Sequence, residues 1–427
     1  MRSLALIFLL VGCKADDVLV DTSGLVDTDD PVDTDPPDPV DAWWDDRWPY
    51  RVQLAIAGTR SIDGVPLTPV IDFAALLDEA GDPSGLAPES LRVVSPDHLS
   101  VWPAQFLDDR VDLMQKSASE APVGDDVGAV AFVADGAWDV SVRVFLYFGS
   151  HANDPGDPLS PALPATVPVG VDGLRTGAMV ANFDRDRGGL LADLTAFSTV
   201  LTSQADSDYG NGLNGQSPPG GWNMSPQDLA AGGFEVLSSG PVAAGVRATG
   251  LRSNDQAGYS YSYEYWAFAG QPELWVRIHA VTTRESLEQH PLDFTRGMRP
   301  WQSRQDALVD SGQTLRREIG AGDRWASIAS EDVGVVMAWH RAPNFAARVI
   351  NSSDDGFGES HRFLSFEAND YMPLGLGTPH TIPDSVAFFD HDLLVVSPFL
   401  PDDTTATDAA ERLIDGIAVT VGPLELR

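Results

Sequence analysis

The segment 259–281 constrains the fold of this chain more than any other part of it. Between Tyr259 and Tyr265 every second residue is a tyrosine, and a period of two is typical of a β-strand. The sequence Ala-Gly-Gln-Pro at 269–272 is typical of a turn, and a second strand is predicted directly after it. The sequence therefore predicts an antiparallel hairpin in which Phe268 pairs with Glu273.

This register divides the hairpin into two faces. One face carries tyrosines opposite apolar residues and suits the core, with Tyr265 opposite Val276, Tyr263 opposite Ile278 and Tyr261 opposite Ala280. The other face carries three matched pairs, which are Trp266 with Trp275, Glu264 with Arg277 and Ser262 with His279. Cross-strand neighbours of this kind interact directly, and a slip of one residue would move one strand's side chains to the opposite face.

The second face has two interpretations. Indole rings beside Glu264, Arg277 and His279 suit a sugar cleft, because a sugar ring stacks on an indole while polar groups bond its hydroxyls. In this interpretation Trp266 and Trp275 bind the substrate. The alternative is a face that lies in solvent and is stabilised by its own cross-strand pairs.

Turn-forming residues extend the same pattern along the chain. Glycine and proline supply 39 and 31 of the 427 residues, which favours many short strands over a helical bundle. We predict an all-β fold, with a small N-terminal β-barrel or sandwich domain at 43–152 and a large antiparallel, supersandwich-like β-sandwich at 169–427. A proline-rich linker at 153–168 separates them. One short helix is expected in each domain, at Phe73–Glu79 with Asp72 as its cap and at Asp408–Ile414.

The first residues resemble a bacterial lipoprotein signal. Arg2 precedes an apolar run from Leu4 to Val11, which is too short to span a bilayer. Leu10-Val11-Gly12-Cys13 resembles a lipobox, so we expect residues 1–12 to be removed and Cys13 to carry the lipid. The alternative is an ordinary cleaved signal followed by an incidental cysteine.

Residues 13–42 are expected to form a disordered tether. Between Lys14 and Asp46 there are twelve aspartates and one lysine, and Val-Asp-Thr recurs every six residues from Val20. Charge repulsion and proline keep such a segment extended. Aspartates also suit calcium, but the segment lacks the glycines of calcium loops, so a structural calcium site is not supported.

Charge and motifs exclude several functions. The formal net charge of −36 makes binding to nucleic acid unfavourable. The single cysteine excludes an internal disulfide and a cysteine-rich metal site. The chain contains no H-E-x-x-H, no G-x-S-x-G and no glycine loop for a nucleotide. We therefore predict no metal and no cofactor.

The first domain resembles a known module. Its opening Trp48 with Tyr50-Arg51 is followed by Ser90–Val94, Pro103–Phe106 and Phe145–Gly149. This order is similar to that of the RIFT-type barrel of exo-rhamnogalacturonan-lyase-like proteins and of an uncharacterised module of bacterial surface proteins. In the lyase-like proteins a β-supersandwich follows the barrel, so the resemblance implies a carbohydrate-active family.

Two further clusters combine an aromatic ring with a cation. They are Arg299-Pro300-Trp301 and Trp339-His340-Arg341. A lyase needs a base and a group that neutralises the uronate, and His279, Arg277, Arg299 and His340 are the candidates for these roles. Glu264 is the candidate carboxylate of a hydrolase. Arg299 and Trp301 join Trp266 and Trp275 as candidate substrate-binding residues.

Two functions remain open at this point. The first is a carbohydrate-related lipoprotein of the cell envelope, either a polysaccharide lyase or a hydrolase with its site on the large sandwich. The second is a non-catalytic surface protein for binding or adhesion. The predicted partners are a polysaccharide or other glycan and, through Cys13, a bacterial membrane, with the outer membrane or cell surface as the expected location. We expect a monomer.

Overall fold

The computed structural model places part of the chain. It describes residues 42–58, 64–107, 126–133, 141–156, 164–168, 172–185, 190–203, 229–230, 233–253, 258–283, 286–288, 292–294, 316–318, 325–329, 333–339, 347–352, 363–368, 380–382, 385, 387–400, 408–410, 413 and 417–427. Trp43–Arg427 forms one compact unit, to which the elements below belong.

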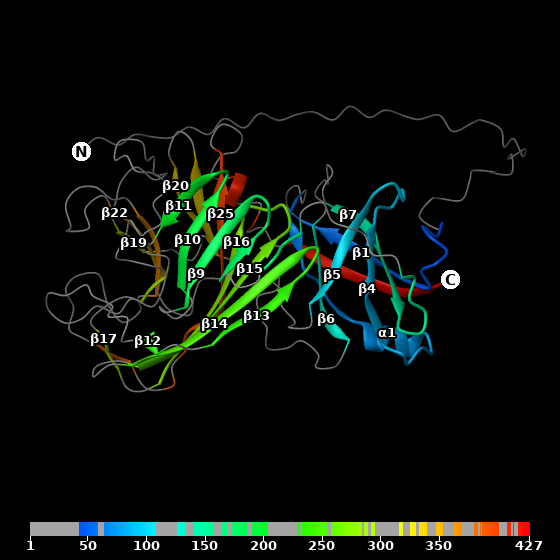
Figure 1. The fold of residues 1–427 in the computed structure, drawn as a ribbon, viewed down its shortest axis with the longest axis horizontal. Coiled ribbons are helices and arrows are strands. Elements are labelled where there is room, and N and C mark those ends of the chain that lie inside the picture. The colour runs from blue at the N-terminus through cyan, green and yellow to red at the C-terminus, as the bar shows by residue number, and fades with distance from the viewer. Residues whose placement is uncertain are drawn as a thin grey trace, which may run out of the picture. The chain divides into compact units, whose positions relative to one another are not determined.

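Eight antiparallel strands form the first sheet, in the order β2-β6-β5-β4-β7-β1-β26 with β3 paired to β6. Their bounds are β1 (Tyr50–Ala57), β2 (Pro66–Leu67), β3 (Val70–Asp72), β4 (Leu86–Val94), β5 (Val101–Leu107), β6 (Val127–Val133), β7 (Ser141–Ser150) and β26 (Ala418–Leu426). Figure 1 shows β26, in red, beside β1, in blue. The last strand of the chain thus joins its first sheet, a pairing that the expected boundaries did not include.

The helix α1 (Phe73–Glu79) begins where the sequence predicts. The Asp72 side chain accepts a hydrogen bond from the Ala75 backbone at 2.8 Å, which caps the first turn. Phe73 and Leu77 are buried against the core of the first sheet. In the part of the chain that the structure describes, no helix has the length and apolar character needed to cross a membrane.

The largest sheet of the second region has the order β12-β14-β15-β16-β25-β21-β20, with β13 paired to β14. Its strands are β12 (Leu229–Ala230), β13 (Phe234–Ser239), β14 (Ala243–Ser253), β15 (Gly258–Phe268), β16 (Leu274–Thr282), β20 (Trp325–Ala329), β21 (Gly334–Trp339) and β25 (Ala387–Phe399). We call it the central sheet. Residues 408–410 and 413 are helical, within the predicted second helix.

Three smaller sheets complete the described strands. Four strands form the sheet β11-β10-β9-β8, four form β18-β23-β22-β19, and two form β17-β24. Their bounds are β8 (Gly173–Arg175), β9 (Met179–Asp184), β10 (Leu190–Ala196), β11 (Thr199–Ser203), β17 (Ser286–Glu288), β18 (Leu292–Phe294), β19 (Arg316–Glu318), β22 (Ala347–Ser352), β23 (Phe363–Ala368) and β24 (His380–Ile382). The predicted all-β class is confirmed.

The register of the β15–β16 hairpin is the predicted one. Trp266 lies opposite Trp275, Glu264 opposite Arg277, and Ser262 opposite His279. At the turn, Gly270 has a φ of +73°, a conformation that side chains with a Cβ rarely adopt. The backbone N–H of Gln271 donates to the Phe268 carbonyl at 3.0 Å, which closes the turn.

The tyrosine face of the hairpin packs inside the second region. The rings of Tyr265 on β15 and Phe183 on β9 have centroids 4.4 Å apart. Tyr263 and Tyr265 are fully buried, and burial raises the pKa of Tyr265. The sheet that contains β9 therefore covers this face, as expected for one layer of a sandwich.

The opposite face is also covered. Trp266 and Trp275 belong to a hydrophobic core that includes strand residues of the first sheet and the helical residues near the C-terminus. The first-sheet members are Leu107, Ala129 and Ala131, and the helical members are Ala409, Ala410 and Leu413. The first sheet and the central sheet consequently share one core.

Gln105 links the two sheets by hydrogen bonds. Its Oε1 accepts from the backbone N–H groups of Val242 at 3.0 Å and Ala243 at 2.8 Å. Its Nε2 donates to the Ala243 carbonyl at 3.1 Å and to Ser238 Oγ at 2.7 Å. A Cβ on Gly240 would lie 2.6 Å from this amide, so a larger residue there would displace the hydrogen-bonded Gln105 side chain.

Candidate functional site

A row of four charged side chains crosses the central sheet. On neighbouring strands, Glu235 of β13 lies opposite Arg247 of β14, Arg247 opposite Glu264 of β15, and Glu264 opposite Arg277 of β16. Because residues in register share a face of the sheet, the four lie on the same side as Trp266 and Trp275. We call Glu235, Arg247, Glu264 and Arg277 the charged row.

Ion pairs connect the charged row. Arg247 donates to Glu264 Oε1 from Nε at 3.1 Å and from Nη2 at 2.9 Å. Its Nη1 lies 3.3 Å from Glu235 Oε2. Arg277 Nη1 lies 3.8 Å from Glu264 Oε2. Signs alternate along the row, and each inner residue contacts a group of opposite charge on both sides.

Exposure rises steadily along the charged row. The side chain of Arg277 is 8% exposed and that of Glu264 is 11% exposed. The side chain of Arg247 is 29% exposed and that of Glu235 is 63% exposed. A ligand therefore reaches Glu235 and Arg247 first, while Arg277 and Glu264 form the buried end.

A second row, of uncharged polar groups and an imidazole, lies beside the charged row. Thr249 lies opposite Ser262, and Ser262 lies opposite His279. All three are partly buried. Beyond His279 the register continues to Asp390 of β25, after a bulge in that strand. Among the described residues no group of three or more His, Cys, Asp or Glu is placed to hold a metal ion.

The structure contradicts the predicted role of Trp266 and Trp275. Both side chains are fully buried, and Trp275 packs edge-to-face on Phe268 with ring centroids 6.1 Å apart. A Cβ added at Gly245, opposite Trp266, would lie 2.6 Å from the indole. A buried indole offers no surface for a sugar ring to stack on. The two tryptophans are core residues because the first sheet covers this end of the face.

The structure also corrects the expected accessibility of Glu264 and Arg277. The hairpin register predicted that they pair, and they do. However, a solvent-facing pair would be largely exposed, whereas both residues are buried. They form the buried end of the charged row. His279 is the predicted catalytic candidate on this face that keeps partial exposure.

The other candidates lie outside the described residues. These are His340, Arg299, Trp301 and the lipidation candidate Cys13. Conversely, Arg247 and Glu235 were missed by the sequence analysis. They lie on β13 and β14, and no turn signal comparable to that at 269–272 predicts how these two strands pair with the hairpin.

The tryptophan cluster before β1, which consists of Trp43, Trp44 and Trp48, has a structural role. The Arg51 guanidinium lies between the rings of Trp43 and Phe145, at 4.5 and 4.3 Å from their centroids. It donates to Glu425 Oε2 at 2.7 Å and to the Tyr147 hydroxyl at 3.0 Å. Burial acts to lower the pKa of Arg51, but the hydrogen bonds to Tyr147 and Glu425 outweigh burial and raise that pKa.

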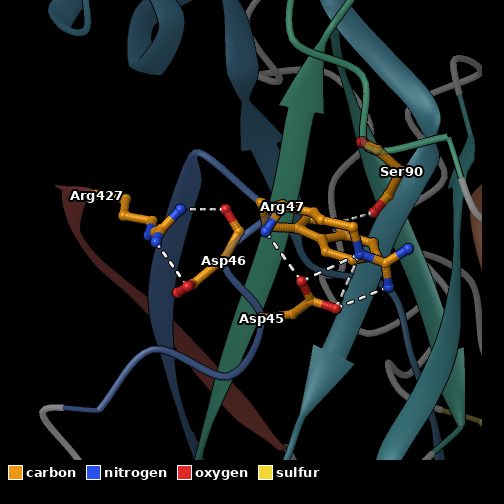
Figure 2. A network of polar contacts seen from close by, with 6 residues as sticks. Asp45, Asp46, Arg47, Ser90 and Arg427 are labelled. Carbon is orange, nitrogen blue, oxygen red and sulfur yellow. Dashed lines mark hydrogen bonds and ion pairs between the residues drawn. The ribbon is translucent and has the colours of Figure 1, made fainter.

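Polar contacts hold the same segment to the end of the chain. Figure 2 shows Arg427 paired with Asp46, at 2.8 Å between Nη2 and Oδ2, and Arg47 paired with Asp45 at 2.7 Å. The Trp48 indole donates to the Ser90 carbonyl at 2.7 Å. These contacts join the start of the unit to its last strand, so the cluster serves the fold of the first sheet.

Comparisons with known proteins give only distant similarity. No protein family matches the chain, and no curated protein matches it. The resemblance to exo-rhamnogalacturonan-lyase-like proteins therefore stays a prediction.

The similar solved structures include two proteins from Enterococcus faecalis. An α-mannosidase from Enterococcus faecalis V583 is 8% identical with a TM-score of 0.46, covering 91% of this chain and 48% of its own. A glycosyl hydrolase family 38 protein from Enterococcus faecalis is 9% identical with a TM-score of 0.47, covering 91% and 50%.

A putative aldose 1-epimerase from Escherichia coli K12 is 10% identical with a TM-score of 0.34, covering 54% of this chain and 99% of its own. A galactose mutarotase-like protein from Lactobacillus casei is 13% identical with a TM-score of 0.28, covering 54% and 100%. The chain spans about half the length of the two Enterococcus faecalis proteins. None of the four scores reaches 0.5, so we infer no activity from them.

Proposed function

We propose that this protein binds carbohydrate and that the accessible end of the charged row, with Thr249, Ser262 and His279, contacts the glycan. The observation that carries the proposal is the placement of a guanidinium, carboxylates, hydroxyls and an imidazole on one face of four adjacent strands. Sugar hydroxyls both donate and accept hydrogen bonds. A guanidinium donates to them and a carboxylate accepts from them.

Binding without turnover fits this geometry better than hydrolysis. A retaining hydrolase needs two carboxyl groups about 5–5.5 Å apart on either side of the glycosidic bond. Here Glu264 is buried between two guanidinium groups. Glu235, the other carboxylate of the row, contacts the same Arg247 from the opposite side. The guanidinium occupies the place that a sugar would need.

The proposal is tested by screening the full-length protein against a panel of immobilised polysaccharides. We expect at least one polysaccharide to be retained and its binding to fall in an Arg247→Ala variant. Arg143, which is exposed on β7 of the first sheet, supplies the matched control Arg143→Ala. Absence of binding to every polysaccharide would contradict the proposal.

A lyase is the second candidate, on one specific observation. Arg277 and His279 are two residues apart on β16 and so share a face, with Ser262 opposite His279. A lyase requires a base that removes the C5 proton and a cation that neutralises the uronate. In this candidate the partly exposed His279 is the base, and Arg277, which is 8% exposed, supplies its charge from the buried end of the charged row. Release of an unsaturated, ultraviolet-absorbing product from a uronate polysaccharide, abolished in His279→Ala, would support this candidate over simple binding.

We also propose that the protein is anchored to a bacterial membrane by a lipid on Cys13. The support is the sequence Leu10-Val11-Gly12-Cys13, which contains the only cysteine of the chain. The Cys13→Ser variant should appear in the soluble fraction, while the unaltered protein sediments with membranes. Sedimentation of the variant after a high-salt wash would contradict the anchor.

A further inference from the structure

We infer that the ligand of this face is an uncharged glycan with neighbouring free hydroxyl groups, and that Glu235 and Arg247 select it. The inference rests on the proposed carbohydrate binding and names its substrate class. It follows from the charge balance of the row, from the charge of the whole chain and from the exposure of the two outer residues.

The charged row has no surplus positive charge. Arg247 contacts the carboxylates of both Glu235 and Glu264, and Arg277 lies 3.8 Å from Glu264. An anionic sugar that approached Arg247 would meet the Glu235 carboxylate, which is 63% exposed, beside the guanidinium. The anionic group and the Glu235 carboxylate would repel each other. If the sugar displaced Glu235, Arg247 would lose one ion pair and gain another, with almost no net gain in free energy.

The charge of the chain acts in the same direction. The formal net charge is −36, from 27 basic and 63 acidic residues. A polyanion such as a uronate polysaccharide is repelled before it reaches the surface, and the repulsion extends over roughly one Debye length. An uncharged polysaccharide meets no such barrier.

The outer pair suits a diol. Arg247 Nη1 and Glu235 Oε2 lie 3.3 Å apart, so a donor and an acceptor stand side by side at the accessible end of the row. Two neighbouring hydroxyls of a sugar offer an acceptor to the guanidinium and a donor to the carboxylate. Arg247 keeps its orientation because its Nε and Nη2 are held by the buried Glu264. A ligand therefore meets a preformed pair.

The test compares uncharged and acidic polysaccharides with the full-length protein by isothermal titration calorimetry. The probes are mannan and galactan on one side, and polygalacturonate and alginate on the other. Each is measured at ionic strengths of about 0.01 and about 0.15 M, where the Debye length is about 30 and about 8 Å. We expect binding of an uncharged polymer, with less than about a twofold change in affinity between the two salts.

Variants locate the binding site. Arg247→Ala and Glu235→Gln should each weaken binding of the uncharged polymer about tenfold, which corresponds to about 1.4 kcal/mol. Arg143→Ala should leave it unchanged. Thermal unfolding of each variant shows that the fold is kept, since both substituted side chains lie at the exposed end of the row.

The outcomes separate the inference from the proposed function. Binding of the acidic polymers alone, weakened by salt, would overturn the inference and leave carbohydrate binding standing. Binding of an uncharged polymer that is unaffected by Arg247→Ala and Glu235→Gln would also overturn it, because the site would lie elsewhere. If no polymer binds, the proposed function itself fails.

Discussion

The two ends of one sheet face differ more than their shared strands suggest. At one end Trp266 and Trp275 are fully buried. On the neighbouring strands, Arg247 of β14 is 29% exposed and Glu235 of β13 is 63% exposed. The pairing of β14, β15 and β16 continues without a register shift between the ends, and β13 has one shift, between Val236 and Ser238. What differs is the neighbour, because residues of the first sheet pack on the tryptophan end.

Alternation identifies the residues that share a face but not whether the face is open. The same pattern of aromatic and charged residues forms a core at one end and an accessible polar surface at the other. Arg51 gives a second example, since an arginine beside tryptophan and glutamate there is enclosed and supports the fold. An aromatic ring next to a cation is therefore not by itself a binding site.

The largest effect is expected at the closed end. Trp275→Ala should lower the free energy of unfolding by about 4 kcal/mol, because it removes a fully buried indole from a shared core. Urea unfolding measures the change. Val236→Ala, at an exposed apolar residue of β13, should cost less than about 0.5 kcal/mol. A small loss of stability in Trp275→Ala, combined with loss of glycan binding, would mean that this end is open.

The buried pair should give the next largest effect. Arg277→Ala leaves the buried Glu264 without one of its two cations and should cost about 3 kcal/mol. In a double-mutant cycle with Glu264→Gln, the double variant should lose less free energy of unfolding than the sum of the two single losses, since the residues interact. Strict additivity in urea unfolding would show that the 3.8 Å contact contributes nothing.

The junction between the first sheet and the central sheet can be tested at Gln105. Gln105→Ala leaves the buried N–H groups of Val242 and Ala243 without their acceptor, and should cost about 2 kcal/mol. Gln105→Glu keeps an acceptor oxygen but turns a second, charged oxygen toward the Ala243 carbonyl, so it should also lower the free energy of unfolding. If both variants unfold like the unaltered protein, the junction does not depend on this side chain.

The smallest effect on stability is expected at the open end. Glu235→Gln should change the free energy of unfolding by no more than about 1 kcal/mol, because its pair with Arg247 is largely exposed. Glycan binding should nevertheless fall about tenfold. A variant that loses binding but little stability, in contrast to Trp275→Ala, distinguishes the open end from the closed end. A loss of several kcal/mol would place Glu235 in the structural core instead.

Local features of the sequence predicted local structure well. The turn at 269–272 and the alternation around it predicted the pairing of Trp266, Glu264 and Ser262 with their partners. Asp72 predicted the start of α1. Both signals act between residues that are close in sequence, where turn geometry and helix capping leave few alternatives.

The all-β class, the hairpin register and the residues on each face of the hairpin thus follow from the sequence alone. Long-range packing places Trp266 and Trp275 in the core, pairs Arg247 with Glu264 and returns β26 to β1. These outcomes depend on segments far apart in the chain, such as Leu107 and Trp266. Burial depends on which distant surface packs against a face, and alternation within one hairpin contains no information about that surface.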